Sequence, residues 1–210
     1  MDKVKVAVVY YSSTGGNYQL AKWAVDGAEA AGAEVKLFRV PELAPREAIE
    51  ENPLWKDNLE ATKDIPAPTP EDLVEADAII WSSPTRYGVM AAQMKQFIDT
   101  LGGVWSKGLL VDKVMSAMSS AMNMNGGVEQ TVLGFITVFF HLGAIVVGPG
   151  YIDPSSYASG GNPYGVTAKV IDGEIMNDPE SAVKFQARRT VEVAGRLLGI
   201  ETLPEKVKTL

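Results

Sequence analysis

The 210-residue sequence contains no cysteine and a single histidine, His141. Without cysteine the chain can form no disulfide, no thiolate metal site and no cysteine nucleophile. It also lacks a basic tract. The 19 Lys and Arg residues are outnumbered by 26 Asp and Glu, which gives a formal net charge of −7. This balance argues against direct binding of nucleic acid.

The sequence also lacks a hydrophobic run long enough to span a membrane. Residues 132–148 carry no charge, but they fall short of the roughly 20 residues that a spanning helix needs. Gly143 divides them into a helix-like half and a β-rich half, which predicts a buried helix followed by a buried strand. Residues 1–3 lead directly into a strand and have no features of a signal peptide. We therefore expect a cytoplasmic protein, which the lack of cysteine also fits.

The most informative stretch that is present is a predicted strand, loop and helix at the N-terminus. Residues 4–11 are mostly β-branched and aromatic, as in a strand that is buried on both faces of a parallel sheet. Three hydroxyl residues and two glycines follow, and a helix begins near Asn17. The amide groups and the positive dipole end of that helix suit a phosphate, although a plain turn rich in small residues is the alternative.

The loop excludes two common nucleotide-binding motifs. It lacks the Lys and the spacing of G-x-x-x-x-G-K-[ST], and it lacks G-x-G-x-x-G. A loop of hydroxyl groups that holds a terminal monophosphate remains. The S-x-T-G pattern directly after the first strand resembles the phosphate loop of flavodoxin-like proteins, which bind FMN.

Strands and helices alternate along the rest of the chain. Further strands are expected at residues 34–40, 77–83, 113–118 and 144–147, and helices at 16–31, 91–101, 128–142 and 179–198. Six prolines between residues 41 and 70 predict an extended surface excursion with at most short helical turns. Trp55 within it either packs on the protein's own core or is offered to a partner. Thr69 and Pro70 predict the start of a short helix.

This alternation predicts a single α/β domain over residues 1–210, with a doubly wound, five-stranded parallel sheet of order 2-1-3-4-5 and helices on both faces. Polar loops follow the first, third and fourth strands, which border the crevice at the carboxyl edge of such a sheet. A Gly- and Pro-rich loop at about 148–165 is long enough to be functional or disordered.

Several motifs together resemble the WrbA-type NAD(P)H:quinone oxidoreductases over nearly the whole chain. They are SSTG at 12–15, PTRYG at 84–88 followed by MAAQMK at 90–95, GGVW at 102–105, GGVEQT at 126–131 and GNPYG at 161–165. The resemblance implies a flavodoxin-like fold with an added segment, FMN as cofactor, NADH or NADPH as co-substrate, and homodimers that assemble into homotetramers.

The resemblance also assigns site residues. Those implied to bind the cofactor are Ser12, Ser13, Thr14, Gly15, Gly16, Asn17, Pro84, Thr85, Arg86, Tyr87, Gly88, Ser120, Ala121, Met122, Asn123, Asn125, Gly126 and His141. Among them, the first six would hold the phosphate, and His141 would reach the flavin across a subunit boundary. Thr14 and Trp105 would contact the nicotinamide or the aromatic substrate. No metal is expected.

Other interpretations of single residues stay open. His141 is also compatible with a core position, Trp105 with a plug at a helix end, and Arg86 with a surface ion pair, while Met122 and Met124 suit adaptable packing. The sequence departs from the family in its Met-rich third loop, in Leu142 where a second His is common, and in the order of residues 15–17. These departures concern the substrate pocket more than FMN binding.

The resemblance implies two-electron reduction of quinones by a ping-pong mechanism, in which the flavin carries the chemistry and no protein acid, base or nucleophile is required. A flavodoxin-like electron carrier between protein partners is the alternative, which the acidic composition favours. A regulatory protein without turnover is a third interpretation. The long loops and the predicted dinucleotide contact favour the reductase, because a small carrier needs neither.

Overall fold

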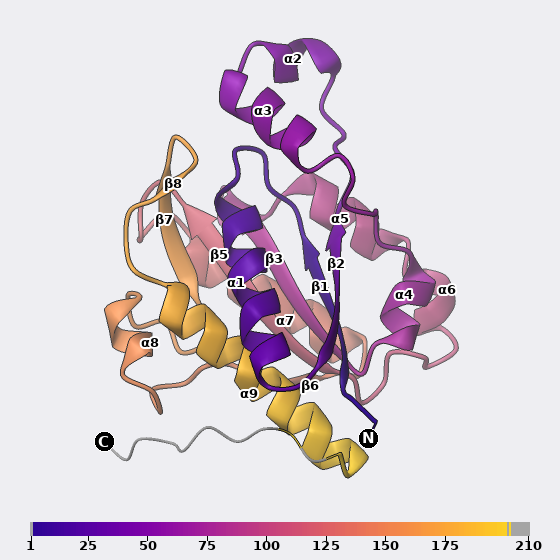
Figure 1. Cartoon of the computed structure of the whole chain (residues 1–210). Coiled ribbons are helices and arrows are strands. Elements are labelled where there is room, and N and C mark those ends of the chain that lie inside the picture. The colour runs from indigo at the N-terminus through magenta and orange to yellow at the C-terminus, as the bar shows by residue number, and fades with distance from the viewer. Residues whose placement is uncertain (1, 201, 203–210) are drawn as a thin grey trace.

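A mostly parallel sheet lies at the centre of the protein and is flanked by helices, as the computed structural model shows for residues 2–200 and 202 (Figure 1). The strands are β1 (Lys5–Tyr10), β2 (Glu34–Arg39), β3 (Ala78–Arg86), β4 (Val89–Met90), β5 (Val114–Ala121), β6 (Ile145–Val146), β7 (Thr167–Ile171) and β8 (Glu174–Ile175). The helices are α1 (Gly16–Ala30), α2 (Arg46–Glu50), α3 (Pro53–Ala61), α4 (Pro70–Glu75), α5 (Ala92–Asp99), α6 (Gly102–Trp105), α7 (Val128–His141), α8 (Ser155–Ala158) and α9 (Glu180–Leu198).

The strand order confirms the predicted topology. It begins β2-β1-β3-β5, and these neighbours are parallel. Both β6 and β7 then pair with β5, β6 through Ile145 beside Val114 and β7 through Thr167 beside Ser119. The predicted fifth strand, at 144–147, therefore forms only the first half of the strand position next to β5. The chain leaves the sheet after β6 and returns to complete the position as β7, which the sequence analysis did not predict.

Two strands are longer than predicted. β3 continues through Arg86 and β5 through Ala121, so that residues 84–86 and 119–121, which were predicted as loop, are strand ends. The reason is pairing across the sheet: Pro84 lies beside Ser120, and Thr85 pairs antiparallel with Met90 of β4. The polar side chains at these positions thus stand on a rigid edge of the sheet.

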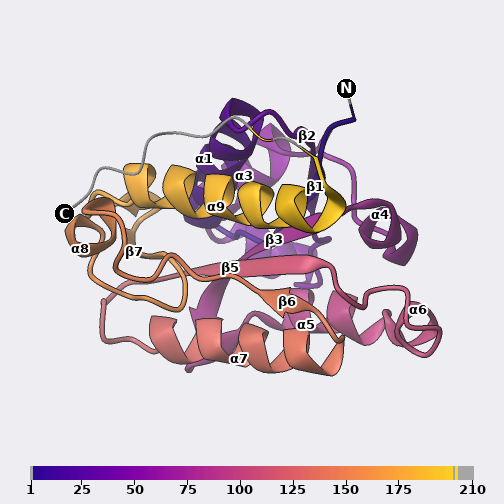
Figure 2. The ribbon, with the colours of Figure 1, turned by 90° about the horizontal axis from the view of Figure 1, so that it is seen from below.

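The sheet is packed between two helical layers, with α1 and α9 on one face and α5 and α7 on the other (Figure 2). Alternate residues of β1 face opposite layers, so Val8 packs with α1 and α9 and Val9 with α5 and α7. Trp81 lies in the second layer, with its ring centroid 6.2 Å from that of Phe135 and 6.1 Å from that of Phe139. The predicted helix is present as α7, but only one of its faces is buried, because Phe140 is 68% exposed, and the strand that was predicted as buried after it, β6, is half-buried.

The proline-rich excursion contains more helix than predicted. Its α3 has nine residues, about two and a half turns, because Asn52 caps its N-terminus and Pro53 occupies the first turn, where proline is compatible with a helix. We call residues 41–68 the arm. In Figure 1 the arm projects above the sheet, over the loop between β1 and α1.

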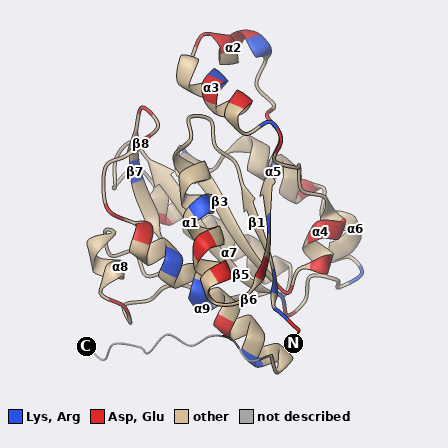
Figure 3. Ribbon diagram, viewed as in Figure 1, with Lys and Arg blue, Asp and Glu red and all other residues tan. Residues whose placement is uncertain are grey.

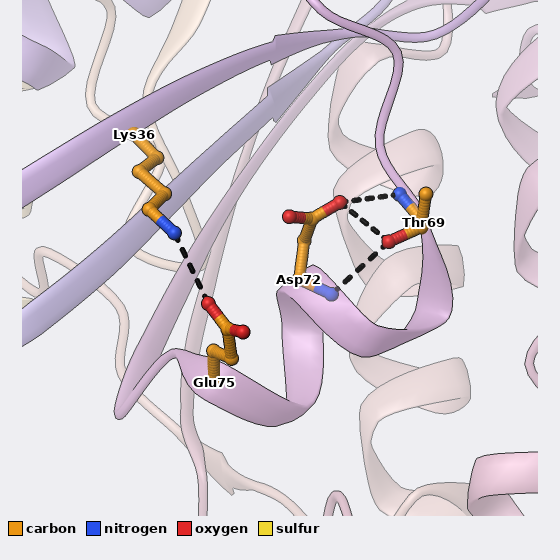
Figure 4. Close-up of polar contacts among 4 residues, drawn as sticks. All are labelled: Lys36, Thr69, Asp72 and Glu75. Carbon is orange, nitrogen blue, oxygen red and sulfur yellow. Dashed lines mark hydrogen bonds and ion pairs between the residues drawn. The ribbon is translucent and has the colours of Figure 1, made fainter.

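The arm ends at the predicted helix start. The Oγ1 atom of Thr69 accepts a hydrogen bond from the amide of Asp72 at 3.2 Å, and the Asp72 carboxylate accepts one from the Thr69 amide at 2.8 Å (Figure 4). This capping box fixes the beginning of α4. Lys36 of β2 pairs with Glu75 at 3.1 Å near the other end of the helix. Across the described part of the chain, no helix combines the length and apolar character that crossing a membrane requires.

Candidate functional site

A cavity of about 490 Å³ opens where β1, β3 and β5 end. Its lining comes from five segments, which are the β1–α1 loop, the arm, the end of β3, the end of β5 with its following loop, and the β7–β8 hairpin. The lining residues are Ser12, Ser13, Thr14, Gly16, Asn17, Asn52, Leu54, Pro84, Thr85, Arg86, Tyr87, Ser120, Ala121, Met122, Asn123, Gly126, Val170 and Asp172. The carboxyl edge of the sheet therefore carries the candidate site, as expected for a doubly wound fold.

The β1–α1 loop forms one end of the cavity. Gly15 precedes α1 with φ of 98°, a left-handed conformation that glycine adopts without strain, and its amide donates to the Ser12 Oγ at 3.0 Å. Gly16 is required by a close contact with the β7–β8 hairpin, because a Cβ there would lie 2.7 Å from a methyl carbon of Val170. The loop is thus held in a fixed shape, with the N-terminus of α1 directed at the cavity.

Asn17 joins this loop to the sheet. Its side chain is 2% exposed, and its Nδ2 donates to the Ser82 Oγ at 3.0 Å. The hydroxyl of Ser120 donates to the Asn17 Oδ1. Three segments distant in sequence are therefore tied together by buried hydrogen bonds at the wall of the cavity, which fixes the first turn of α1 against the ends of β3 and β5.

The turn after β3 forms the other end of the cavity. The hydroxyl oxygen of Thr85 accepts from the Gly88 amide at 3.2 Å and from the Thr131 hydroxyl of α7 at 2.7 Å. Tyr87 is fully exposed and has φ of 55°, which is uncommon for a residue other than glycine. Such conformations persist where the surroundings impose them, and they are frequent at binding sites.

The charges around the cavity are few. Figure 3 shows Lys and Arg interspersed with Asp and Glu along α1, α3 and α9. Among the described residues that line the cavity, Arg86 is the one cation and Asp172 the one carboxylate. Arg86 donates to the Ser13 Oγ at 3.3 Å and to the Thr85 carbonyl at 2.9 Å. Its guanidinium therefore bridges the two ends of the site.

The arm is fastened at its base by Glu42. This carboxylate accepts hydrogen bonds from Tyr11 Oη at 2.8 Å, from Trp55 Nε1 at 2.9 Å and from Gln93 Nε2 at 2.5 Å. Burial by itself would raise the pKa of Glu42, but the donors around it, with the Ala44 amide foremost, outweigh burial and lower it. Trp55 thus bonds to its own protein through Glu42, although it is half-buried and belongs to neither hydrophobic core.

We expect Glu42→Gln to reduce the free energy of unfolding by about 1–2 kcal/mol at pH 7, because hydrogen bonds to a charged acceptor are lost. Because the pKa of Glu42 is lower in the folded than in the unfolded protein, its charged form stabilises the fold fully above the unfolded-state pKa of about 4.3. This stabilisation is lost as the pH falls through the folded-state pKa of Glu42. The difference between the two proteins in urea unfolding should therefore shrink below about pH 4.5. Glu47→Gln, an exposed carboxylate on α2, is the matched control. A difference that stayed constant from pH 7 to pH 3 would contradict this role.

Five of the residues that the sequence assigned to the site do not line the cavity. Gly15 and Gly88 shape its adjoining turns, and Asn125 lies in the loop after β5. Trp105 and His141 lie at the far end of α7, where the Trp105 Nε1 donates to the His141 carbonyl at 2.8 Å. The 14 residues of α7 separate its ends by about 20 Å. Neither side chain reaches the cavity of its own chain.

Four lining residues were not predicted from the sequence, which are Asn52, Leu54, Val170 and Asp172. A signal for the last two was present, because Asp172 and Gly173 separate two β-prone runs, a pattern typical of a hairpin. The hairpin packs closely on the loop, since a Cβ at Gly173 would lie 2.5 Å from the Thr14 carbonyl oxygen. No local signal placed the arm residues at the cavity.

The residues present fit a flavin mononucleotide. One end of the cavity offers hydroxyl groups and the N-terminus of a long helix, which suit a phosphate. The other end combines backbone groups of residues 84–87 with the apolar surface of Ala121 and Met122, which suits a flat heteroaromatic ring. The volume is within the range of about 300–1,000 Å³ that is usual for small-molecule sites.

Comparison with known proteins points to the same ligand. Residues 4–156 match the protein family described as NADPH-dependent FMN reductase. An NAD(P)H dehydrogenase (quinone) of Deinococcus radiodurans is 47% identical over 196 residues, which cover 93% of this chain and 98% of that protein. An NAD(P)H dehydrogenase (quinone) of Brucella abortus is 39% identical over 210 residues, which cover 93% of this chain and 100% of that protein.

Solved structures confirm the flavodoxin-like fold. A flavodoxin, WrbA-like protein from Agrobacterium tumefaciens has a TM-score of 0.65 at 21% identity and covers 92% of this chain and 99% of its own. A flavodoxin from the domain Archaea has a TM-score of 0.59 at 19% identity and covers 91% of this chain and 99% of its own.

Proposed function

Because this chain belongs to the family of NADPH-dependent FMN reductases, and to the WrbA-type quinone oxidoreductases that its motifs predicted, we propose that it is an FMN-dependent NAD(P)H dehydrogenase that reduces quinones. The observation that carries the proposal is the cavity at the ends of β1, β3 and β5, with a helix N-terminus at one end and backbone groups at the other.

The chain's own residues bind and orient the cofactor. Ser12, Ser13 and Thr14, with the first turn of α1, would hold the phosphate, and Arg86 adds a positive charge between the phosphate end and the ring end. Residues 84–88 would contact the edge of the ring. When bound, FMN would supply the two-electron chemistry between NAD(P)H and a quinone, in which the hydride of NAD(P)H and one proton from water would provide the two electrons and two protons that the hydroquinone gains. The protein needs no acid, base or nucleophile for these transfers.

The proposal includes a ping-pong mechanism. The cavity has one exposed ring end, bordered by Tyr87 and Met122, which are both well exposed. Two substrates that use this end in turn cannot be bound there together. We therefore expect parallel double-reciprocal lines when the rate is measured over a matrix of NADH and quinone concentrations, whereas intersecting lines would contradict the mechanism.

The proposal also includes assembly into homodimers and homotetramers. Trp105 and His141 are exposed and lie about one α7 length from the cavity of their own chain, so contact with flavin or substrate requires a second copy. Light scattering with size-exclusion chromatography tests this part. A monomer with full activity would contradict a shared site.

The test of the function begins with titration of the purified protein with FMN, followed by flavin fluorescence quenching. Oxidation of NADH and of NADPH is then measured with and without benzoquinone. The proposal expects saturable turnover only when FMN, a nicotinamide cofactor and benzoquinone are all present. Tight FMN binding with no turnover would overturn the reductase and favour an electron carrier, and failure to bind FMN would overturn both.

A further inference from the structure

The arm makes a direct contact with the outer side of the β1–α1 loop. The Nδ2 group of Asn58, on α3, donates to the carbonyl oxygen of Ser12 at 2.9 Å and to that of Ser13 at 3.1 Å. Asn58 is half-buried, and it does not belong to the described residues that line the cavity. The contact therefore holds the backbone of the loop through a residue that is not itself part of the cavity lining.

Peptide geometry gives this contact a consequence for the ligand side. A trans peptide is planar, and its N–H points opposite to its C=O. The carbonyls of Ser12 and Ser13 share peptide planes with the amides of Ser13 and Thr14. Holding both carbonyls toward Asn58 therefore turns both amides the other way, and Ser13 and Thr14 line the cavity. Two adjacent amides that point into a concave loop form an anion-binding arrangement.

Asn58 is itself held in place by the rest of α3. The guanidinium of Arg39, at the end of β2, donates to the Leu59 carbonyl at 3.0 Å and to the Thr62 hydroxyl at 2.8 Å. That hydroxyl donates in turn to the Asn58 carbonyl at 2.7 Å. The donor is thus presented by a helix that is anchored to the sheet, which gives it a defined position before any ligand binds.

We propose that Asn58 is a positioning residue that sets the two peptide planes of the phosphate loop, so that docking of the arm determines the affinity for the ligand's phosphate. The proposal rests on the function proposed above, because it takes FMN as the ligand. The arm then has two roles, as a wall of the cavity and as a support for the backbone of the β1–α1 loop. Asn52 and Leu54 form a wall of the cavity, whereas Asn58 acts only through the backbone of residues 12–14.

The test compares FMN with riboflavin, which has the same ring system and no phosphate. Asn58→Ala should weaken FMN binding about tenfold, because the amides of Ser13 and Thr14 lose their fixed orientation, and should change riboflavin binding less than twofold. Both dissociation constants are measured by fluorescence quenching on the full chain. Asp57→Ala, at an exposed position of the same helix, is the matched control and should leave both constants unchanged.

The ratio of the FMN affinity to the riboflavin affinity shows whether Asn58 acts on phosphate binding. Equal weakening of FMN and riboflavin would overturn the proposal, because the arm would then serve only as a wall, and so would unchanged FMN binding. If Asn58→Ala does not fold, Asn58→Ser, whose hydroxyl is too short for both carbonyls, takes its place with the same expected ratio. Absence of FMN binding by the unaltered chain would overturn the proposed function as well, so the two failures are distinguishable.

Discussion

Replacing Gly127 by Ala is expected to weaken FMN binding by roughly 100-fold and to lower the free energy of unfolding by about 3 kcal/mol. Gly127 precedes α7 with φ of 91°, a conformation that strains any residue with a Cβ. A Cβ there would also lie 2.7 Å from the Cα of Gly88. Because this neighbour is backbone, the turn of residues 85–88 must move, and the ring end of the cavity moves with it.

Gly134, in the interior of α7, provides the matched control. A Cβ at Gly134 meets no atom within 4 Å, and the same substitution there removes a glycine from a helix interior. Gly134→Ala should therefore leave FMN binding unchanged and raise the free energy of unfolding by up to about 1 kcal/mol. Fluorescence titration and urea unfolding of both variants measure these effects. Equal FMN affinity in the two variants would show that the contact between Gly127 and Gly88 does not shape the site.

Asn17→Ala should lower the free energy of unfolding by about 2–4 kcal/mol and weaken FMN binding by at least about tenfold. The substitution removes the acceptor of the buried Ser120 hydroxyl and the side-chain donor to the Ser82 hydroxyl, which keeps only a bond of 3.4 Å to the carbonyl of residue 17, and poorly paired buried polar groups are costly. It also frees the first turn of α1 from the ends of β3 and β5. The loop that would hold the phosphate is then no longer fixed to the sheet by the hydrogen bonds of the Asn17 side chain.

A second buried polar contact serves as the control for stability alone. Thr190 of α9 donates to the Ser116 Oγ of β5 at 3.0 Å, and both residues are at most 1% exposed. Thr190→Val should destabilise the protein by about 1–2 kcal/mol without changing its affinity for FMN, because this contact lies in the middle of the sheet. Chemical unfolding and flavin titration of the two variants separate the effects. If Asn17→Ala destabilised the fold but bound FMN normally, the network would have no role in the site.

A double-mutant cycle adds a sharper measurement. Ser82→Ala removes the acceptor of the Asn17 Nδ2 group, and Asn17→Ala removes the donor of that same hydrogen bond, so each single variant breaks the bond between the two side chains. The pair of substitutions removes both groups together. We expect the double variant to be more stable than the sum of the single effects predicts, by about 1 kcal/mol or more. Strict additivity would mean that the two side chains do not depend on each other.

The sequence by itself determined the parts of the protein that rest on local pattern. Residues 4–17 read as strand, glycine-containing loop and helix, and the structure has β1, a left-handed Gly15 and α1 there. Thr69 and Pro70 predicted the start of α4, where the capping box lies. The strand order also followed, because short connections and right-handed crossovers leave few alternatives once strands and helices alternate. The first two of these signals are contained in a few neighbouring residues, whereas the strand order follows from the alternation of elements along the chain.

Only the tertiary structure decided which distant residues complete the site. Asn58 reaches Ser12 across 46 positions of sequence, and Asn17 meets Ser120 across 103. The sequence assigned Asn17 and Ser120 to the ligand, and the structure places both in the lining of the cavity and joins their side chains by a hydrogen bond. It also puts Trp105 and His141 at the opposite end of α7. Such contacts depend on how the sheet twists and how the arm and hairpin fold back over its edge. Since no residue pattern encodes those long-range positions locally, packing of the whole chain had to supply them.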